Sequence, residues 1–242
     1  TRRDDARWYT LQLTNQIYGA AFDSRLVRNI REEKGYTYGA YTRMDMKRLA
    51  GDIEATAEVR TPVTGDSLTE FFYDLNRIRD EVVPEEELQD AKNYLAGVFP
   101  LRAETQEGMT GLILNQQLYG LPSDYLQTYR ENVNAVTAEE VQRVAREHLQ
   151  PDTLAIVIVG DAGEILPQVR EYASKIEIFD TDGKEKSLSD YESNADEPTA
   201  DLSGSWELSL DFQGQPVPVT LAIEQEGESI SGKLTTMLGE CE

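Results

Sequence analysis

The stretch from Phe22 to Tyr41 constrains the fold of this chain more than any other part of it. Its sequence, FDSRLVRNIREEKGYTYGAY, predicts a helix, a glycine stop and a strand. Asp23 or Ser24 can cap the start of the helix, and apolar residues recur within it at helical spacing. Gly35 stands where helices commonly end in a left-handed conformation, and the aromatic run YTYGAY that follows favours a strand.

Arg31 and Tyr38 are the candidate functional residues of this corner. A guanidinium and a phenol side by side are two donors that suit a peptide carbonyl gaining negative charge. From the residues alone, a purely structural role is favoured for both residues. A cation such as Arg31 is stabilised in a last helical turn, and Tyr38 can fill a strand face. Tyr36 is the main rival of Tyr38, since residues two apart on one strand share a face.

Helical and strand patterns follow one another along the first three quarters of the chain. Helices are predicted over residues 8–18, 64–78, 84–98, 103–119, from Pro122 onward, 137–148 and 164–173, with capping boxes at Ser67/Glu70 and Thr137/Glu140. Strands are predicted over 53–59, 154–159 and 175–179, and LAIVIV at 154–159 is apolar on both faces, as in the middle of a covered sheet. Blocks of elements rather than strict alternation predict an α+β fold, with one mixed or antiparallel sheet and helices packed on one face.

Composition divides the chain into three parts. Residues 1–179 form the predicted α+β domain, which opens in mid-pattern, so we expect it to be incomplete at its N-terminus. Residues 180–201 are rich in acidic residues and predict a flexible linker. Residues 202–242 predict three short strands with turns near Gln213–Gly214 and Glu226–Gly227, which is typical of a partial small β-domain.

Charge and composition exclude several classes of function. The net charge of −22 argues against a nucleic-acid partner, because no basic face is available to replace phosphate counterions. No apolar run approaches the ~20 residues that a membrane-spanning helix needs. A single cysteine, Cys241, excludes an internal disulfide framework.

The segment SRLVRNIREEKGYTYGAY resembles the helix–turn–strand of the second, non-zinc half of pitrilysin/insulinase-type metallopeptidases. VPEEELQDAKNYLAGVFPLRAET, and then the run from QLYGLPSDYLQTYRENVNAVTAEEVQRVAREHLQ to VIVGD, resemble later parts of the same half in the same order. The resemblance covers about Trp8 to Phe179. It implies the C-terminal, non-zinc half-domain of a peptidase that encloses peptides in a chamber.

The resemblance also implies which residues act. In that family the non-zinc half contributes an Arg and a Tyr that bind the substrate carbonyl and stabilise the oxyanion, and the matching residues here are Arg31 and Tyr38. Tyr36 and Gly39 are the candidate substrate-binding residues beside them. The family's zinc motif, His-x-x-Glu-His, is absent: His148 is the only histidine, and a catalytic zinc needs three protein ligands. Zinc would therefore be bound by a partner half, in the same polypeptide or a separate subunit, and this chain alone is predicted to be inactive.

Three functions follow as hypotheses. The leading one is the substrate-binding half of a zinc-dependent metalloendopeptidase, in which an extended peptide could also pair with the strand at residues 52–60. The first alternative is a catalytically inactive scaffold or assembly subunit of the same family. The second is a ligand- or surface-binding module formed by the β-domain. Because bacterial members with appended domains are often exported, the resemblance favours a periplasmic or extracellular location.

Overall fold

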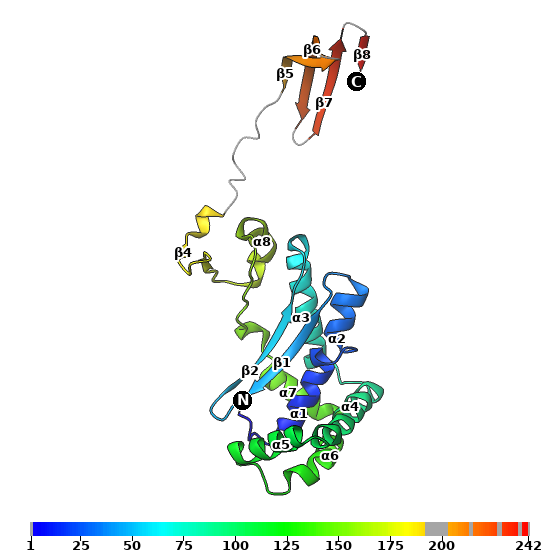
Figure 1. Cartoon of the computed structure of the whole chain (residues 1–242), viewed down its shortest axis with the longest axis vertical. Coiled ribbons are helices and arrows are strands. Elements are labelled where there is room, and N and C mark those ends of the chain that lie inside the picture. The colour runs from blue at the N-terminus through cyan, green and yellow to red at the C-terminus, as the bar shows by residue number, and fades with distance from the viewer. Residues whose placement is uncertain (1, 192–202, 213–214, 227–228, 237–238, 242) are drawn as a thin grey trace. The chain divides into compact units, whose positions relative to one another are not determined.

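The computed structural model describes residues 2–191, 203–212, 215–226, 229–236 and 239–241. The chain divides into two compact units, Thr1–Glu192 and Ser193–Glu242. Figure 1 colours the first from blue to yellow and the second from orange to red. Within the described residues, no helix combines the length and the apolar character that crossing a membrane requires.

Helices make up most of the first unit (Figure 1). Helix α1, Trp8–Asn15, continues into a π-helical turn at Gln16–Ala20. The others are α2, Arg25–Val27; α3, Thr64–Asp80; α4, Glu85–Ala103; α5, Gln106–Tyr119; α6, Tyr125–Ala135; α7, Ala138–His148; and α8, Ala162–Val169. A main core forms where α1, α3, α4, α6 and α7 meet, and its buried members include Leu13, Leu75, Ile78, Leu88, Val133 and Val141. Burying each of these side chains contributes about 1.5–3 kcal/mol, which fixes the inner face of each helix.

The ends of the helices confirm some of the expected caps and correct others. Thr137 begins α7 with the predicted capping box: its backbone N–H donates to Glu140 Oε2 over 2.9 Å, and the N–H of Glu140 donates to Thr137 Oγ1 over 3.3 Å. The box predicted at Ser67 is not formed. Ser67 already lies inside α3, and its hydroxyl donates to the carbonyl of Val63 over 2.7 Å. Ser24 stands at the start of α2, but its side chain makes no cap hydrogen bond there.

Gly108 allows a close approach at the turn between α4 and α5. A Cβ at this position would lie only 1.8 Å from the carbonyl oxygen of Arg102, so no side chain fits without a shift of the backbone. Gly111 has open space instead, since a Cβ there would meet nothing within 4 Å. The sequence left open whether these glycines serve a close approach or a bend, and at Gly108 the structure shows the close approach.

The sheet of the first unit is an antiparallel hairpin of β1, Ala40–Met46, and β2, Gly51–Ala57. Ala40 pairs with Ala57 and Met46 with Gly51 at its two ends. Ile53 and Ala57 of β2 pack against the main core, so one face of the hairpin is covered by helices. The α+β class with helices packed on one face of an antiparallel sheet is therefore confirmed.

Two predicted strands do not join this sheet. Residues 154–159 form no strand in the described part of the chain, and Val157 and Val159 are 87% and 96% exposed. The expectation of a central, covered strand is wrong for this structure because no neighbouring strand pairs with these residues there. The strand predicted at 175–179 shortens to β3, Ile178–Phe179, which pairs with β4, Glu185–Lys186.

The acidic segment predicted as a flexible linker, residues 180–201, belongs only in its first part to the first unit. Its first part holds β4 and a 3₁₀ turn at Leu188–Asp190, and residues 192–202 lie outside the described residues. The second unit is an antiparallel sheet of β5, Gly204–Phe212; β6, Gln215–Glu226; β7, Ser229–Thr236; and β8, Gly239–Cys241. The sequence predicted three strands, and the structure adds the fourth. The expected turn residues Gln213, Gly214 and Gly227 lie outside the described residues.

Candidate functional site

The helix that carries Arg31 is fixed to the rest of the unit by apolar and polar contacts. Helix α2 passes into a π-helical turn at Arg28–Glu33, and Leu26 and Ile30 are fully buried in the main core. On the polar side, Asn29 Nδ2 donates to Glu70 Oε2 over 2.8 Å and to Asp74 Oδ2 over 2.9 Å. These contacts tie the segment to α3.

The turn after this helix is set by Gly35 and Thr37. Gly35 adopts φ = +64°, the left-handed conformation that the sequence predicted, and the N–H of Tyr36 donates to the carbonyl of Ile30 over 3.0 Å. The Thr37 hydroxyl donates to the carbonyl of Glu58 over 2.5 Å, which fixes the turn beside the end of β2. Strand β1 consequently begins at Ala40, and the expectation that the whole run YTYGAY is strand is corrected.

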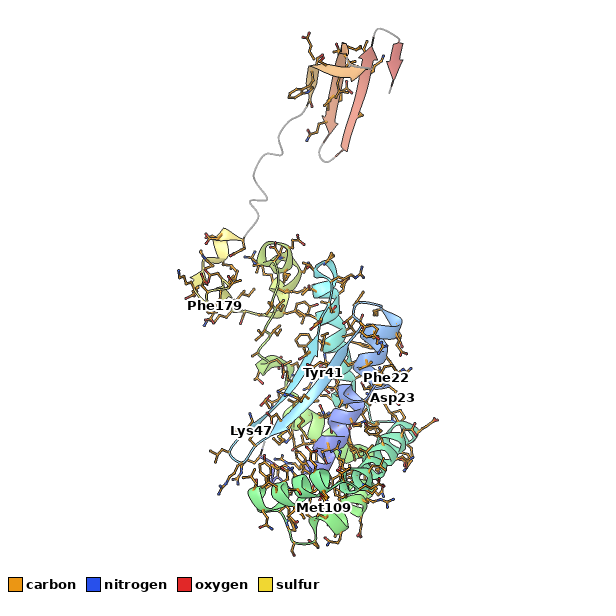
Figure 2. All side chains as sticks on the ribbon, in the orientation of Figure 1. Phe22, Asp23, Tyr41, Lys47, Met109 and Phe179 are labelled. Carbon is orange, nitrogen blue, oxygen red and sulfur yellow. The ribbon has the colours of Figure 1, made fainter. Side chains whose placement is uncertain are left out.

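Arg31 lies between two aromatic rings. Its Cζ atom is 4.6 Å from the ring centroid of Phe22 and 4.9 Å from that of Tyr38. Phe22 lies in the turn ahead of α2, next to Asp23, as Figure 2 shows. The rings are 67% and 88% exposed, so the sandwich stands at the surface of the unit. Cation–π contacts at exposed sites contribute about 0.5–1 kcal/mol each, enough to restrict the guanidinium.

The polar atoms of this pair remain available for a ligand. Among the described residues, no hydrogen bond or ion pair involves the guanidinium of Arg31 or the hydroxyl of Tyr38. Arginine carries five N–H donors and tyrosine one O–H donor. The two rings hold the planar cation without using any of these donors, so the corner can offer them to an oxygen atom from outside.

The structure brings together some of the predicted site residues and separates others. Arg31 and Tyr38 are in contact, as expected. Tyr36 is partly buried against the main core whereas Tyr38 is exposed, and because β1 begins only at Ala40 the two residues do not share a strand face. Gly39 is exposed, with nothing within 4 Å of the position that a Cβ would take. Phe22 was not predicted as a site residue, and its one available signal was an aromatic side chain just ahead of the helix start.

A network of carboxylates lies behind the corner. Burial raises the pKa of Asp74, against the hydrogen bond from Asn29 and the charge of Arg77. Burial would also raise the pKa of Glu70, but hydrogen bonds from Lys34 and Asn29 outweigh it, and the pKa is lowered. The ion pair between Lys34 Nζ and Glu70 Oε1 spans 2.7 Å. Glu70 therefore anchors the end of the Arg31 helix in its charged form.

The described residues do not fit a catalytic zinc ion. No group of three His, Cys, Asp or Glu side chains among them could hold a metal. His148 ends α7, and burial lowers its pKa, with the charge of Arg7 acting in the same direction. Because no second and third ligand stand beside it among the described residues, His148 does not form part of a zinc site there.

Comparisons with known proteins show which family and relatives the chain resembles. The family profile described as "Peptidase M16 inactive domain" matches residues 1–95. The "Non-peptidase homolog YmxG" of Helicobacter pylori is 25% identical over 145 residues, which are 60% of this chain and 34% of that protein. An "Uncharacterized zinc protease" of Mycobacterium bovis is 28% identical over 173 residues, covering 67% of this chain and 37% of that protein.

The fold of this chain is also similar to that of a solved structure. The crystal structure of a peptidase M16 inactive domain from Pseudomonas fluorescens matches with a TM-score of 0.58 and 27% identity, over 62% of this chain and 36% of that chain. This chain spans about a third of the length of the curated relatives that it matches. Residues 1–95 match the inactive domain of the peptidase M16 family, and the resemblance to the non-zinc half of pitrilysin/insulinase-type metallopeptidases is thereby confirmed.

Proposed function

We propose that this chain is the substrate-binding, non-zinc half of a zinc-dependent metalloendopeptidase, and that Arg31 and Tyr38 bind the substrate carbonyl. The observation that supports the proposal is the exposed contact between these two side chains, whose polar donors have no partner among the described residues. A zinc ion held by a partner half would supply the activated water.

The chemistry of the pair suits an oxygen atom that gains charge. A guanidinium stabilises a carbonyl oxygen more strongly as that oxygen becomes an oxyanion, and a phenolic O–H adds a second, shorter hydrogen bond. Stacking between Phe22 and Tyr38 limits the orientations of Arg31 before substrate arrives. Less conformational freedom is then lost on binding, which is the advantage of a preorganised site.

Tyr36 and Gly39 have supporting parts in this proposal. The backbone N–H of Gly39 donates to Thr37 Oγ1 over 3.0 Å, so it is not free for substrate. The open space around Gly39 instead allows a peptide backbone to approach closely. Tyr36, packed against the core, holds the turn that presents Tyr38.

Reconstitution with the zinc-binding half tests the proposal. Zinc content and peptidase activity are measured for the chain alone, for the zinc half alone and for the mixture. We expect activity only in the mixture, and we expect Arg31→Ala and Tyr38→Phe each to lower kcat by about 10²–10³, as for the loss of one oxyanion donor. Arg28→Ala and Tyr41→Phe are matched controls, because both side chains are exposed near the corner but outside the stacked pair.

A scaffold function is the second candidate, favoured by the relative named as a non-peptidase homolog. Under this function the two halves would associate, and the mixture would remain inactive although both are folded. Unchanged kcat in both Arg31→Ala and Tyr38→Phe would also reject the catalytic proposal. A rise in KM alone would mean that the pair binds the ground state only.

A further inference from the structure

The open face of the β1–β2 hairpin leads to the stacked pair of Arg31 and Tyr38. Alternate residues of a strand lie on opposite faces, and Ala57 of β2 packs against the main core. Glu58, the residue that follows it, is exposed and therefore belongs to the open face. The face of the sheet that the helices do not cover thus ends in a carboxylate.

The turn at Thr37 brings Glu58 next to the stacked pair. The Thr37 hydroxyl lies 3.0 Å from the carbonyl oxygen of Gly39 and 2.5 Å from that of Glu58. Gly39 directly follows Tyr38 and precedes β1, just as Glu58 directly follows β2, the partner strand of β1. Consecutive Cα atoms are about 3.8 Å apart and neighbouring strands about 4.8 Å, so Glu58 lies within reach of one long side chain bound at Tyr38.

The carboxylate of Glu58 is available to a ligand. Among the described residues, no hydrogen bond or ion pair involves this carboxylate, although the backbone carbonyl of Glu58 accepts from Thr37. Glu54, two turns of the same alternation back along β2, already pairs with Arg43 on β1 over 3.6 Å. Beside the guanidinium of Arg31, the open face therefore holds a negative charge that no described cation compensates.

Open space separates this carboxylate from the stacked pair. Gly39 lies between them, and a Cβ at this position would meet nothing within 4 Å. A long side chain can therefore cross Gly39, with its methylene groups toward the exposed ring of Tyr38 and its end at Glu58. Lysine and arginine have this form, because an apolar stem carries a charged head that stays in water. An acidic side chain in the same place would be repelled.

We propose that Glu58 selects peptides with a basic side chain next to the carbonyl that Arg31 and Tyr38 bind. The inference rests on the proposed function, since it takes the pair as the carbonyl site. The bound carbonyl oxygen is negative and meets a cation, whereas the basic side chain meets a carboxylate. Such complementarity fixes the register of the peptide, because a shifted peptide would place like charges together. The substrate class is then cationic peptides, which the net charge of −22 also attracts.

Peptides that differ in one side chain test the inference in the reconstituted peptidase. Lysine is moved through each position of a blocked alanine hexapeptide, and norleucine, which keeps the four-carbon stem without the charge, replaces it in a matched set. At one position beside the cleaved bond, we expect lysine to raise kcat/KM about two- to fivefold over norleucine, as for one exposed ion pair. The ratio should fall toward one at about 1 M salt, where exposed charges are screened.

Variants of the chain assign this preference to one carboxylate. Glu58→Gln should remove the preference for lysine and leave kcat/KM for the norleucine peptide unchanged. Glu58→Lys should reverse the preference in favour of glutamate at the same position. Asp52→Asn is the matched control, because Asp52 is an exposed carboxylate of the same strand about 20 Å away, and the preference should persist in it.

Binding by the chain alone separates this inference from the proposed function. The same peptides are titrated into the chain while the NMR signal of the Gly39 N–H, which lies between the pair and Glu58, is followed. We expect the lysine peptide to bind with a Kd about two- to fivefold lower than that of the norleucine peptide, and Glu58→Gln to remove the difference. Arg31→Ala should weaken both peptides by the same factor.

The two readouts give distinct outcomes. If the mixture is active, the kinetic ratio decides: equal kcat/KM for lysine and norleucine at every position, or a preference that survives Glu58→Gln, would overturn the inference and leave the peptidase function in place. If the mixture is inactive, the peptidase function fails and binding decides. A difference in Kd that depends on Glu58 would then support the inference, and equal or undetectable binding would overturn it.

Discussion

The guanidinium of Arg31 is held between Phe22 and Tyr38, with its Cζ atom 4.6 Å from one ring centroid and 4.9 Å from the other. One ring precedes the helix and the other follows the turn, so the cation joins both ends of the corner. Tyr38 was expected from its place in the motif, but Phe22 was not. The relationship gives Phe22 a positioning part in the proposed site.

We therefore expect Phe22→Ala to loosen Arg31 without unfolding the chain. Loss of one exposed cation–π contact corresponds to about 0.5–1 kcal/mol, or a two- to fivefold fall in kcat of the reconstituted peptidase. The Arg31 Nε–H signal in the NMR spectrum should also become more mobile, a readout that does not depend on activity. Phe22→Tyr keeps the ring and should restore both values. Equal mobility of Arg31 with Phe22 and with alanine at that position would contradict the assignment.

Gly35→Ala should destabilise the first unit and disturb the corner. Gly35 adopts φ = +64°, a conformation that is unfavourable for an L-residue with a Cβ by about 1–2 kcal/mol. Urea unfolding measures the loss as a lower free energy of unfolding. Gly39→Ala is the matched control, since its Cβ would meet nothing within 4 Å and no positive φ is required there. Equal effects of the two substitutions would show that the left-handed turn carries no strain.

The ion pair between Arg25 and Glu87 should matter more than the surface ion pairs. Arg25 Nε and Nη2 donate to Glu87 Oε1 and Oε2 over 2.8 and 2.7 Å, and the Arg25 side chain is only 5% exposed. Glu87→Gln removes the charge and one acceptor, leaving a buried cation poorly paired. We expect the free energy of unfolding to fall by about 1.5–3 kcal/mol. Glu86→Gln, in the same first turn of α4 but exposed, should change it by less than about 0.5 kcal/mol.

Stability should depend on the protonation of His148. Burial lowers the pKa of His148 below its ordinary value of 6.5. The unfolded chain therefore binds the proton more readily than the folded chain does. The stabilising contribution is fully present above about pH 6.5 and is lost as the pH falls toward the lower folded value. His148→Gln should flatten the change in melting temperature between about pH 7.5 and pH 5.5. An unchanged slope in this variant would assign the acid sensitivity to other groups.

The sequence predicted best what local chemistry decides. Gly35, the Thr137 capping box and the helical stripes depend on residues within a few positions of one another, and the structure reproduces them. Ser67 shows the limit of such patterns: its spacing to Glu70 suits a cap, but an earlier helix start at Thr64 places it inside the helix.

What depends on distant residues was predicted less well. The apolar run at 154–159 predicted a covered strand, yet a strand exists only when another strand pairs with it. The separation of Tyr36 from Tyr38 follows from the contact between Thr37 and Glu58, which delays the start of β1. Sequence spacing within the motif could not reveal a contact between residues so far apart. An exported location and the function of the second unit stay predictions from the sequence.

The π-helical turn at Arg28–Glu33 links the direction of Arg31 to a helical register. A π turn accommodates one more residue than an α turn, and each residue of a helix rotates the next side chain by about 100°. Deleting one residue of this turn ahead of Ile30 would return it to α geometry and rotate Ile30 and Arg31 together by about 100°, which would turn the guanidinium away from both rings. The orientation of the cation therefore depends on the number of residues in the helix. A single-residue deletion there would remove the contact of Arg31 with both rings although Arg31, Phe22 and Tyr38 are all retained.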